Sequence, residues 1–295
     1  MQISFDSKDW HKKINIQGDF MFINNVLEIR IINQLNHIQK QQSILAYRLA
    51  TGQRINSAAD DAAGLAISEK MRAQIRGLRQ AQRNAADGIS LIQTAEGAMN
   101  EIHAILQRMR EISVQAANGT YTDSDRRNLN EEFQQLKEAI TGIATSTEFN
   151  TQSLLDGSKS HKGIRLQIGP NAGNSMEVTI NDMRASGIGI ENLDISTQEG
   201  AQEAIETLTK SIDYVSGERS KLGAIQNRLE HTIRHLENYE ENLTAAESRI
   251  RDADMAATIM EYIKYQILSM TAQAILAQFM YLKRQQLLLL LSSIR

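Results

Sequence analysis

The sequence predicts a mainly α fold, a long antiparallel helical rod or coiled coil with a small β-hairpin region. Three observations support this fold class. The 295-residue chain contains a single proline, so almost nothing in it interrupts a helix. Apolar residues repeat in alternating steps of three and four near both ends of the chain, which is the pattern of coiled-coil seams. Only one stretch, in the middle, alternates apolar and polar residues as a strand pair does.

The first helix is expected over residues 24–54. Its apolar residues follow a heptad pattern that Gln42 interrupts, and a break follows at residues 52–57. The residues of this seam are Leu27, Ile31, Leu35, Ile38, Leu45 and Leu49. A stripe of this kind is buried against a long partner helix.

Two further helices are expected before the middle of the chain. The second begins near Ser57, where Ser57 and Asp60 have the spacing of an N-terminal cap, and it ends near Asn118–Gly119. Its seam consists of Ile67, Met71, Ile75, Leu78, Ala85, Ile89, Ile92, Met99, Ile102, Leu106 and Met109. The third is capped by Thr122 or Asp123 and has the most regular spacing in the chain. Its seam consists of Leu129, Phe133, Leu136, Ile140 and Ile143.

Residues 145–200 have a different pattern. Two short runs alternate apolar with polar residues, and residues 169–174 (GPNAGN) between them are rich in turn formers. The apolar positions of the two runs are Ile164, Leu166, Ile168, Met176, Val178 and Ile180. We therefore expect a β-hairpin near residues 163–181.

The last helix is expected to begin near Thr197 and to be very long, with a local break near residues 251–257 left open. Its seam continues from Ile205 towards the C-terminal end through Ile263, Ile267, Met270, Ala274, Ala277, Tyr281 and Leu288. A helix of 60 residues is about 90 Å long, and such a helix buries its stripe only against another long helix. The N-terminal and C-terminal helices are therefore expected to pair with each other.

Composition excludes several classes of function. The 32 basic and 35 acidic residues give a net charge of −3, which provides no general attraction for nucleic acid or anionic membrane. The chain has no cysteine, so disulfides, thiolate chemistry and Cys-type zinc sites are absent. Residues 1–20 contain no apolar run, and no stretch approaches the ~18 continuous apolar residues of a membrane span, so neither a cleaved signal peptide nor membrane insertion is expected.

The sequence contains no candidate catalytic, cofactor-binding or metal site, and we expect no enzyme. His231 and His235 have the spacing of metal ligands on a helix, but no acidic residue stands between them, and a solvated helix face explains them more simply. Gly187–Gly189 lacks the third glycine of a phosphate-binding loop. A stripe of four arginines has no interleaved aromatic residues, which favours ion pairing within a bundle or between subunits over nucleic-acid binding. Its members are Arg72, Arg76, Arg79 and Arg83.

Residues 57–72 (SAADDAAGLAISEKMR) and 88–98 (GISLIQTAEGA) resemble the N-terminal signature of the bacterial flagellin family. Residues 226–232 (QNRLEHT), 241–250 (ENLTAAESRI) and 252–256 (DADMA) resemble its C-terminal signature. The terminal helices are more apolar than is usual in the family, whose ends are rich in Asn, Ser, Ala and Gln.

The resemblance implies a structural subunit that self-assembles into the extracellular filament of the bacterial flagellum and serves motility. It implies a terminal coiled-coil domain of residues 21–56 and 255–295, which forms an inner tube, and a helical rod domain of residues 57–254. Residues 1–20 are expected to be an atypical N-terminal extension. The residues of the implied assembly seam are Leu27, Leu35, Leu45, Leu49, Ile263, Ile267, Met270 and Leu288.

The resemblance also implies partners. These are further copies of the chain, the flagellar type III export apparatus with its export chaperone, and hook-associated proteins. Export by this route needs no cleaved signal peptide. Residues 107–111 (QRMRE) resemble the segment that a toll-like innate receptor recognises in flagellins. By that likeness the contacting residues are Arg108, Ile112, where the family usually has leucine, and Glu132.

Three alternatives stay open at this point. A hook–filament junction protein or a minor flagellin shares both ends of the sequence and differs in abundance and bulk polymerisation. A secreted ligand of an innate immune receptor would form filaments only secondarily. An enzyme would need a site in residues 145–200, where the sequence shows no suitable group of residues.

Overall fold

The computed structural model describes residues 7–160 and 162–293, and it confirms the mainly α fold with a small β region. The chain divides into two compact units, which we call the terminal unit and the central unit. The terminal unit comprises the described parts of Met1–Glu69 and Ala246–Arg295, and the central unit comprises Lys70–Ala245. The domain limits expected from the sequence, 21–56 with 255–295 and 57–254, stay a prediction.

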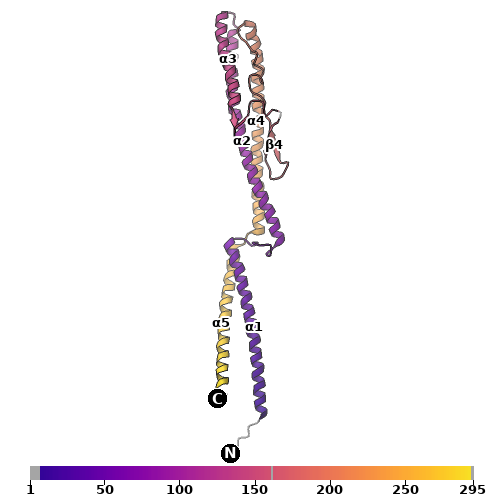
Figure 1. Ribbon diagram of the computed structural model, residues 1–295, viewed down its shortest axis with the longest axis vertical. Coiled ribbons are helices and arrows are strands. Elements are labelled where there is room, and N and C mark those ends of the chain that lie inside the picture. Colours follow the sequence, from indigo (N-terminus) through magenta and orange to yellow (C-terminus); the bar gives the residue numbers. More distant parts are fainter. Residues whose placement is uncertain (1–6, 161, 294–295) are drawn as a thin grey trace, which may run out of the picture. The chain divides into compact units, whose positions relative to one another are not determined.

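The terminal unit consists mainly of two antiparallel helices that lie side by side, α1 (Ser7–Thr51) and α5 (Met255–Ser293) (Figure 1). The backbone is helical well before the expected start at residue 24. Side chains before Val26 lie outside the described residues, and with them the contacts of the extension 1–20.

α1 presents most of its predicted seam to α5. Ile38 and Leu45 are buried, and Ile31, Leu35 and Leu49 are half-buried. Leu27 does not belong to this face, because its side chain is exposed. Glu28 takes the corresponding position, and its carboxylate accepts a hydrogen bond from the Lys283 ammonium at 2.7 Å. This ion pair fixes the register of the two helices near their free ends.

The expected long C-terminal helix is two helices. Three residues, 252–254, separate α4 (Gln198–Arg251) from α5. Asp254 starts the new helix, because its carboxylate accepts a hydrogen bond from the amide of Ala257 at 3.1 Å. The break is held against the segment after α1: the Arg54 amide donates to the Arg251 carbonyl at 2.7 Å, and the Ala253 amide donates to the Gly52 carbonyl at 2.9 Å.

Helix α2 (Ala62–Ala116) begins later than the Ser57 cap predicted. The Asp60 carboxylate accepts hydrogen bonds from the amides of Asn56 and Ser57, which closes a loop instead of starting a helix. Asp61 caps the helix, because its carboxylate accepts from the Gly64 amide at 2.9 Å. The prediction of the Ser57–Asp60 cap was therefore wrong by one turn, since both aspartates were suitable and local spacing did not separate them.

The central unit is formed by α2, α3 (Asp123–Ser146) and α4, with the β-hairpin against α4 (Figure 1). The three helices and the segment before α4 enclose a large apolar core, and Leu78, Ala81 and Leu236 form a second, smaller one between α2 and α4. The large, fully buried side chains of the large core include Ile92, Met99, Ile102, Leu106, Met109, Phe133, Ile140, Leu154 and Leu155. Most of the residues of the seams predicted for α2 and α3 lie in or against the large core.

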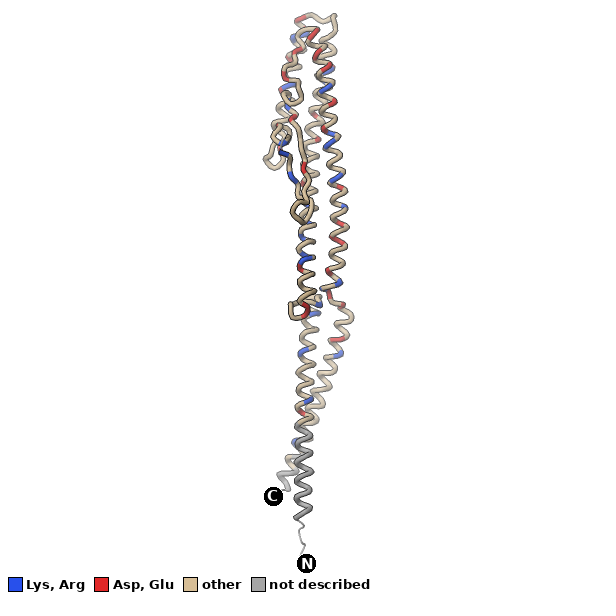
Figure 2. Tube along the Cα trace, turned by 90° about the vertical axis from the view of Figure 1, so that its right-hand side faces the viewer, with Lys and Arg blue, Asp and Glu red and all other residues tan. Residues whose placement is uncertain are grey.

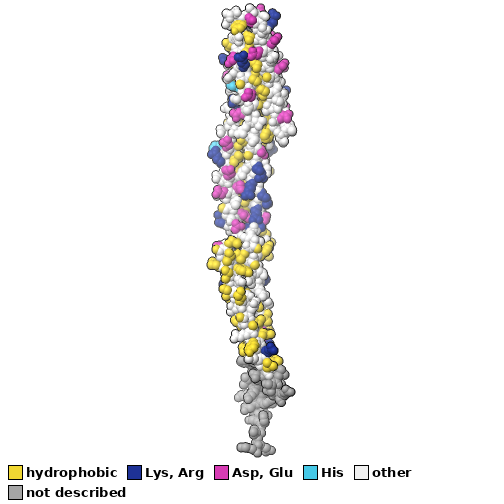
Figure 3. Space-filling model, turned by 90° about the vertical axis from the view of Figure 1, so that its left-hand side faces the viewer, with side chains coloured by type: hydrophobic (Ala, Val, Ile, Leu, Met, Phe, Trp, Pro, Cys, Tyr) yellow, Lys and Arg dark blue, Asp and Glu magenta, His cyan; other side chains and the backbone are white. Residues whose placement is uncertain are grey.

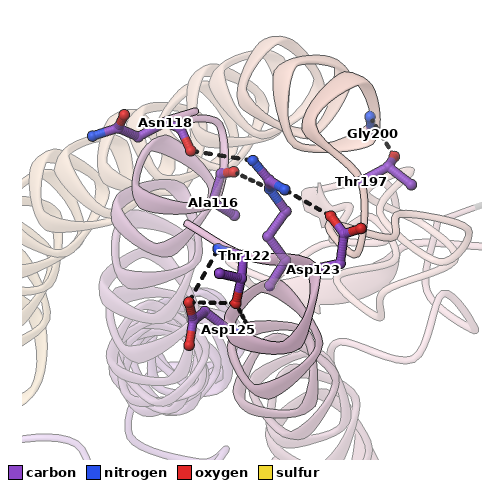
Figure 4. Close-up of polar contacts among 8 residues, drawn as sticks. Ala116, Asn118, Thr122, Asp123, Asp125, Thr197 and Gly200 are labelled. Carbon is purple, nitrogen blue, oxygen red and sulfur yellow. Dashed lines mark hydrogen bonds and ion pairs between the residues drawn. The ribbon is translucent and has the colours of Figure 1, made fainter. Parts of the chain in front are cut away.

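A buried arginine closes the connection between α2 and α3. The Arg126 guanidinium donates to the carbonyls of Ala116 at 3.0 Å and Asn118 at 3.3 Å, and to the Asp123 carboxylate at 2.9 Å (Figure 4). A cation at the C-terminal end of a helix neutralises carbonyls that have no partner within the helix. α2 therefore ends close to the predicted position near residue 118.

The start of α3 is fixed by a capping box. The Thr122 hydroxyl accepts from the Asp125 amide at 3.3 Å, while the Asp125 carboxylate accepts from the Thr122 amide at 3.0 Å (Figure 4). The Thr122 hydroxyl also donates to the Asp125 carboxylate at 2.7 Å, and this bond, followed by that from the Thr122 amide, holds the pKa of the Asp125 carboxyl below its usual value. Of the two residues predicted to cap this helix, Thr122 and Asp123, the structure has Thr122 as the N-cap.

The predicted hairpin is present as β3 (Ile164–Gln167) and β4 (Ser175–Val178), an antiparallel pair in which Ile164 lies opposite Val178. Met176, Val178 and Ile180 point into the core. A second, two-residue pair was not predicted, β1 (Glu148–Phe149) with β2 (Gln152–Ser153). Its turn has positive φ at Asn150 and Thr151, a conformation that threonine rarely adopts and that sequence does not signal.

Candidate assembly surface

Helix α5 presents one face to α1, which we call the inner row. Its members are buried or half-buried and follow steps of three and four: Tyr262, Tyr265, Ser269, Ala272, Leu276, Phe279 and Lys283. Small, hydroxylated and aromatic residues dominate this row. The inner row is therefore less apolar than a coiled-coil seam usually is.

The opposite face of α5, the outer row, is more apolar and exposed in the single chain. It also follows steps of three and four from Met260 to Tyr281, and Leu288 continues it seven residues later: Met260, Ile263, Ile267, Met270, Ala274, Ala277, Tyr281 and Leu288. Met260 is 67 % exposed, Ile267 58 % and Met270 60 %. On one flank between the two rows, the exposed residues Leu268, Ile275 and Leu282 recur every seven residues.

One side of α5 is polar. Lys264, Thr271, Gln278 and Gln285 recur at seven-residue intervals and are all exposed, and we call them the polar column. Only four residues of α5 carry a charge, namely Glu261, Lys264, Lys283 and Arg284. α5 is therefore apolar around most of its circumference.

The surface views show the same contrast between the units. Over the described part of the terminal unit, hydrophobic side chains dominate the face seen in Figure 3, whereas acidic and basic side chains are frequent over the central unit. Along the traces of α2, α3 and α4, charges of both signs alternate, and α5 has few (Figure 2). Large apolar side chains that are exposed in this way typically mark an interaction surface.

The predicted assembly seam falls on two different faces. Leu35, Leu45 and Leu49 of α1 point towards α5 within the chain. Ile263, Ile267, Met270 and Leu288 belong to the outer row, and Leu27 is exposed on α1. The first group thus holds the helix pair together, and the second is available to other molecules. Periodicity missed the inner row of α5 because the outer row, with the larger aliphatic side chains, gives the stronger signal.

The predicted receptor-contact residues lie on α2 and α3, within a few turns of the connection between these two helices. Arg108 donates to the Glu132 carboxylate at 3.0 Å and to the Glu111 carboxylate at 3.3 Å, and both pairs are exposed. These bonds, first that with Glu132, raise the pKa of Arg108. Ile112 is only 1 % exposed and packs in the core, so only Arg108 and Glu132 of the three present side chains to a partner. Their role as receptor contacts stays a prediction.

The sequence matches two regions of one known protein family. The bacterial flagellin N-terminal helical region matches residues 22–160, and the bacterial flagellin C-terminal helical region matches residues 203–291. Together they include more than half of the chain. The chain belongs to the bacterial flagellin family.

Similar proteins agree with this assignment. A flagellin of Halalkalibacterium halodurans is 54 % identical to this flagellin over 233 residues, which are 78 % of this chain and 85 % of the relative. A flagellar filament core protein of Brachyspira hyodysenteriae is 46 % identical over 243 residues, again 78 % and 85 % of the two chains. A solved structure of a flagellar hook-associated protein from Vibrio parahaemolyticus, 15 % identical, covers 65 % of this chain and 100 % of its own with a TM-score of 0.55. This last likeness shows the fold alone.

The described residues of this flagellin contain no group of His, Asp and Glu side chains arranged to hold a metal ion. His235 stacks against Tyr239 with ring centroids 6.4 Å apart, and His231 contacts Arg234 through Nδ1 at 3.3 Å. In the arginine stripe, Arg79 pairs with Glu240 of α4 at 2.6 Å, and this pair lowers the pKa of the Glu240 carboxyl. Arg79 therefore links α2 to α4 through an ion pair.

No helix within the described part of this flagellin combines the length and the apolar character that crossing a bilayer requires. The exposed apolar surface of α5 is distributed around a helix that also carries the polar column. The polar column recurs every seven residues in the sequence, but the periodicity of apolar residues does not reveal it.

Proposed function

We propose that this flagellin is a structural subunit that self-assembles into a bacterial flagellar filament and serves motility. One observation carries the proposal: α5 is apolar around most of its circumference, while α1 covers only its inner row. A helix that is apolar on all sides is stable when other helices surround it. Further copies of the same chain supply such helices, and a net charge of −3 opposes their approach only weakly.

The exposed surface is large enough to drive association. Complete burial of one Ile or Met side chain contributes about 1.5–3 kcal/mol. Met260, Ile267 and Met270 each keep more than half of their surface exposed in the single chain, so roughly half of that contribution remains for contacts between subunits. Several such residues per subunit are sufficient to offset part of the entropy that association costs.

We further propose the cellular context that this role requires. The subunit is exported without a cleaved signal peptide through the flagellar type III apparatus to the extracellular filament, where hook-associated proteins join it. An export chaperone covers α5 beforehand, because an exposed apolar helix aggregates readily. The proposed role needs no catalysis, cofactor or metal. In it, residues 21–56 and 255–295 form the inner coiled-coil domain, and residues 57–254 form the rod domain.

Removal of residues 260–295 tests the function. Full-length protein, added to short filament seeds, is expected to polymerise above a critical concentration, measured by sedimentation and electron microscopy. The truncated chain is expected to remain monomeric while circular dichroism shows that the central unit is still helical. A truncated chain that forms full-length filaments contradicts the proposal.

A pair of point variants locates the contact. Ile263→Gln with Ile267→Gln places two amides on the outer row and is expected to prevent polymerisation. The matched control, Thr271→Ala with Gln278→Ala, changes the polar column and is expected to polymerise more nearly like the original chain. Loss of polymerisation in the control alone would show that the polar column, and not the outer row, makes the contact between subunits, which contradicts the proposal. Bulk polymerisation of the pure chain also distinguishes a filament subunit from a hook–filament junction protein.

Recognition by a toll-like innate receptor is a second candidate function, favoured by the exposed Arg108–Glu132 ion pair. Free subunits with Arg108→Ala or Glu132→Ala are expected to bind the receptor more weakly than the original chain in a surface-binding assay. Arg127→Ala, an exposed arginine on α3, provides the control. Unchanged binding by both test variants contradicts this candidate.

A further inference from the structure

Four methionines of α5 carry thioethers that the single chain leaves open to solvent. Met260 and Met270 are more than half exposed, as is Met280, and Met255 is exposed as well. Met260, Met270 and Met280 follow one another at ten-residue intervals, which is about 15 Å along a helix axis. Exposed thioethers therefore occur from the start of α5 to Met280.

The central unit contains methionines of the opposite kind. Met99, Met109, Met176 and Met183 are buried in its apolar core. The susceptibility of methionine to oxidation follows the exposure of its sulfur. One chain thus contains an accessible set and a protected set, and the protected set is an internal control.

We propose that Met255, Met260, Met270 and Met280 are oxidation sites for hydrogen peroxide, and that their oxidation stops the free subunit from entering the filament. The inference rests on the proposed function, because it requires α5 to be buried between subunits. It adds an oxidised state of the same α5 surface, and a subunit in this state does not assemble.

The reaction needs only the thioether and the peroxide. A lone pair on Sδ attacks one peroxide oxygen, so that an S–O bond forms while the O–O bond breaks. The sulfur loses two electrons, and the second oxygen leaves as hydroxide. This hydroxide takes the proton from the transferred hydroxyl group, which gives one methionine sulfoxide and one water.

The product has different consequences in water and in the filament. The sulfoxide oxygen is a strong hydrogen-bond acceptor, whereas the thioether is a weak one. In the free subunit, water satisfies this oxygen. Against an apolar surface such as Ile263, Ile267 and Ile275, no side chain donates a hydrogen bond to it. Burial of the oxidised residue is therefore unfavourable, while folding of the free chain is little affected.

The first experiment maps oxidation in free subunits and in assembled filaments treated with the same concentration of hydrogen peroxide. Peptide mass spectrometry follows each methionine over time. In free subunits, the four α5 methionines are expected to oxidise at least about tenfold faster than the four central ones. In filaments, the α5 methionines are expected to oxidise at least about tenfold more slowly than they do in free subunits. Equal oxidation of α5 methionines in the two forms overturns the inference.

The second experiment measures polymerisation of the treated subunits. Oxidation is expected to raise the critical concentration at least about tenfold, which corresponds to about 1.4 kcal/mol. A variant with Met→Leu at all four positions keeps the apolar character without sulfur, and it is expected to assemble equally well before and after treatment. Normal assembly of the treated original chain overturns the inference, as does equal loss of assembly in the treated leucine variant.

A measurement without substitutions covers the case in which the leucine variant assembles poorly. A partly oxidised sample of the original chain is polymerised and separated into filaments and free subunits. Sulfoxide at the four positions is expected to be enriched among the free subunits, and equal content in both fractions overturns the inference. The untreated original chain tests the proposed function separately, because its failure to polymerise contradicts that function whatever peroxide does.

Discussion

The central and terminal units are built from the same kind of heptad sequence, but they use apolar residues differently. In the central unit, three helices and a hairpin enclose most of the seam residues, and Ile140 and Phe133 are fully buried. In the terminal unit, α5 has an apolar row on the side away from its only described partner helix. The number of apolar rows on a helix, rather than their presence, therefore distinguishes a unit that completes its own core from one that requires further chains.

This difference also separates two kinds of energetic contribution. Burial in the central unit stabilises the folded single chain, whereas the outer row of α5 contributes only when other chains cover it. Substitutions of the same chemistry at the two places should therefore affect different measurements. Four predictions test this, from the largest expected change in the stability of the single chain to the smallest.

Ile140→Ala is expected to have the largest effect. It removes three carbon atoms from a fully buried side chain and leaves a cavity, which costs about 2–5 kcal/mol. Urea unfolding followed by circular dichroism measures the loss. Val114→Ala, at an exposed position of the same unit, is the control and should change the free energy of unfolding by less than about 0.5 kcal/mol. Equal effects of the two substitutions would show that the core of the central unit is not closed.

Arg126→Met tests whether the central unit depends on a single buried cation at the end of α2. The substitution removes hydrogen bonds to the carbonyls of Ala116 and Asn118 and to Asp123. A hydrogen bond to a charged group contributes about 1.5–3 kcal/mol, and since methionine keeps the apolar part of the side chain, a total loss of about 2–3 kcal/mol is expected. Arg127→Met, on the exposed neighbouring residue, is the control. Faster amide hydrogen exchange in the last turn of α2 should accompany the loss.

Thr122→Ala tests the capping box of α3. Loss of the cap is expected to reduce the stability of the central unit by about 1 kcal/mol at neutral pH. Part of this effect depends on pH, because the folded pKa of Asp125 lies below the unfolded value of about 3.9. The contribution of the Asp125 carboxylate is thus present above that value and is lost as pH falls through the folded pKa.

Unfolding curves at several pH values check this dependence. The difference in stability between the original chain and Thr122→Ala should be largest at neutral pH and should decrease on acidification below about pH 4. A difference that grows on acidification would show that Asp125 does not act through Thr122.

Ile267→Ala is expected to have the smallest effect on the single chain, although it is the same chemical change as Ile140→Ala. Its side chain is mostly exposed, so the free energy of unfolding should change by less than about 0.5 kcal/mol. The critical concentration for polymerisation, measured by sedimentation, should nevertheless rise several-fold. A loss of single-chain stability as large as that of Ile140→Ala would abolish the distinction between the two units.

Much of the fold follows from patterns that are local in the sequence. The seams of α2 and α3 lie in the core because each of these helices has one dominant apolar row. The hairpin followed from alternation around the only proline-containing turn, at Pro170. The sequence allows either one continuous helix or a break at residues 252–254, because the apolar pattern continues through this segment. Only the bonds to residues 52–54 show the interruption.

The remaining features depend on contacts between distant segments. Periodicity identified the outer row of α5, but it could not show that α1 packs on the inner row with Ser269 and Ala272. Likeness to the family placed Ile112 with Arg108, and the two are neighbours one turn apart on α2, yet Ile112 packs in the core while Arg108 stays exposed at its edge. The sequence gives no sign that Arg126 is buried, because the carbonyls that it binds lie at the end of α2, whereas Arg126 belongs to α3.

Within the proposed filament, the polar column of α5 has a consequence for the export of further subunits. A filament that covers every apolar side of α5 leaves Lys264, Thr271, Gln278 and Gln285 to face water, so each subunit contributes one polar stripe to a wetted surface. Three of these four side chains are uncharged. An unfolded polypeptide that moves along such a surface meets few fixed charges and no apolar patches, and neither its acidic nor its basic segments are retained strongly. In the proposed filament, the helix that binds its neighbours would thus also present a surface with few charges to exported chains.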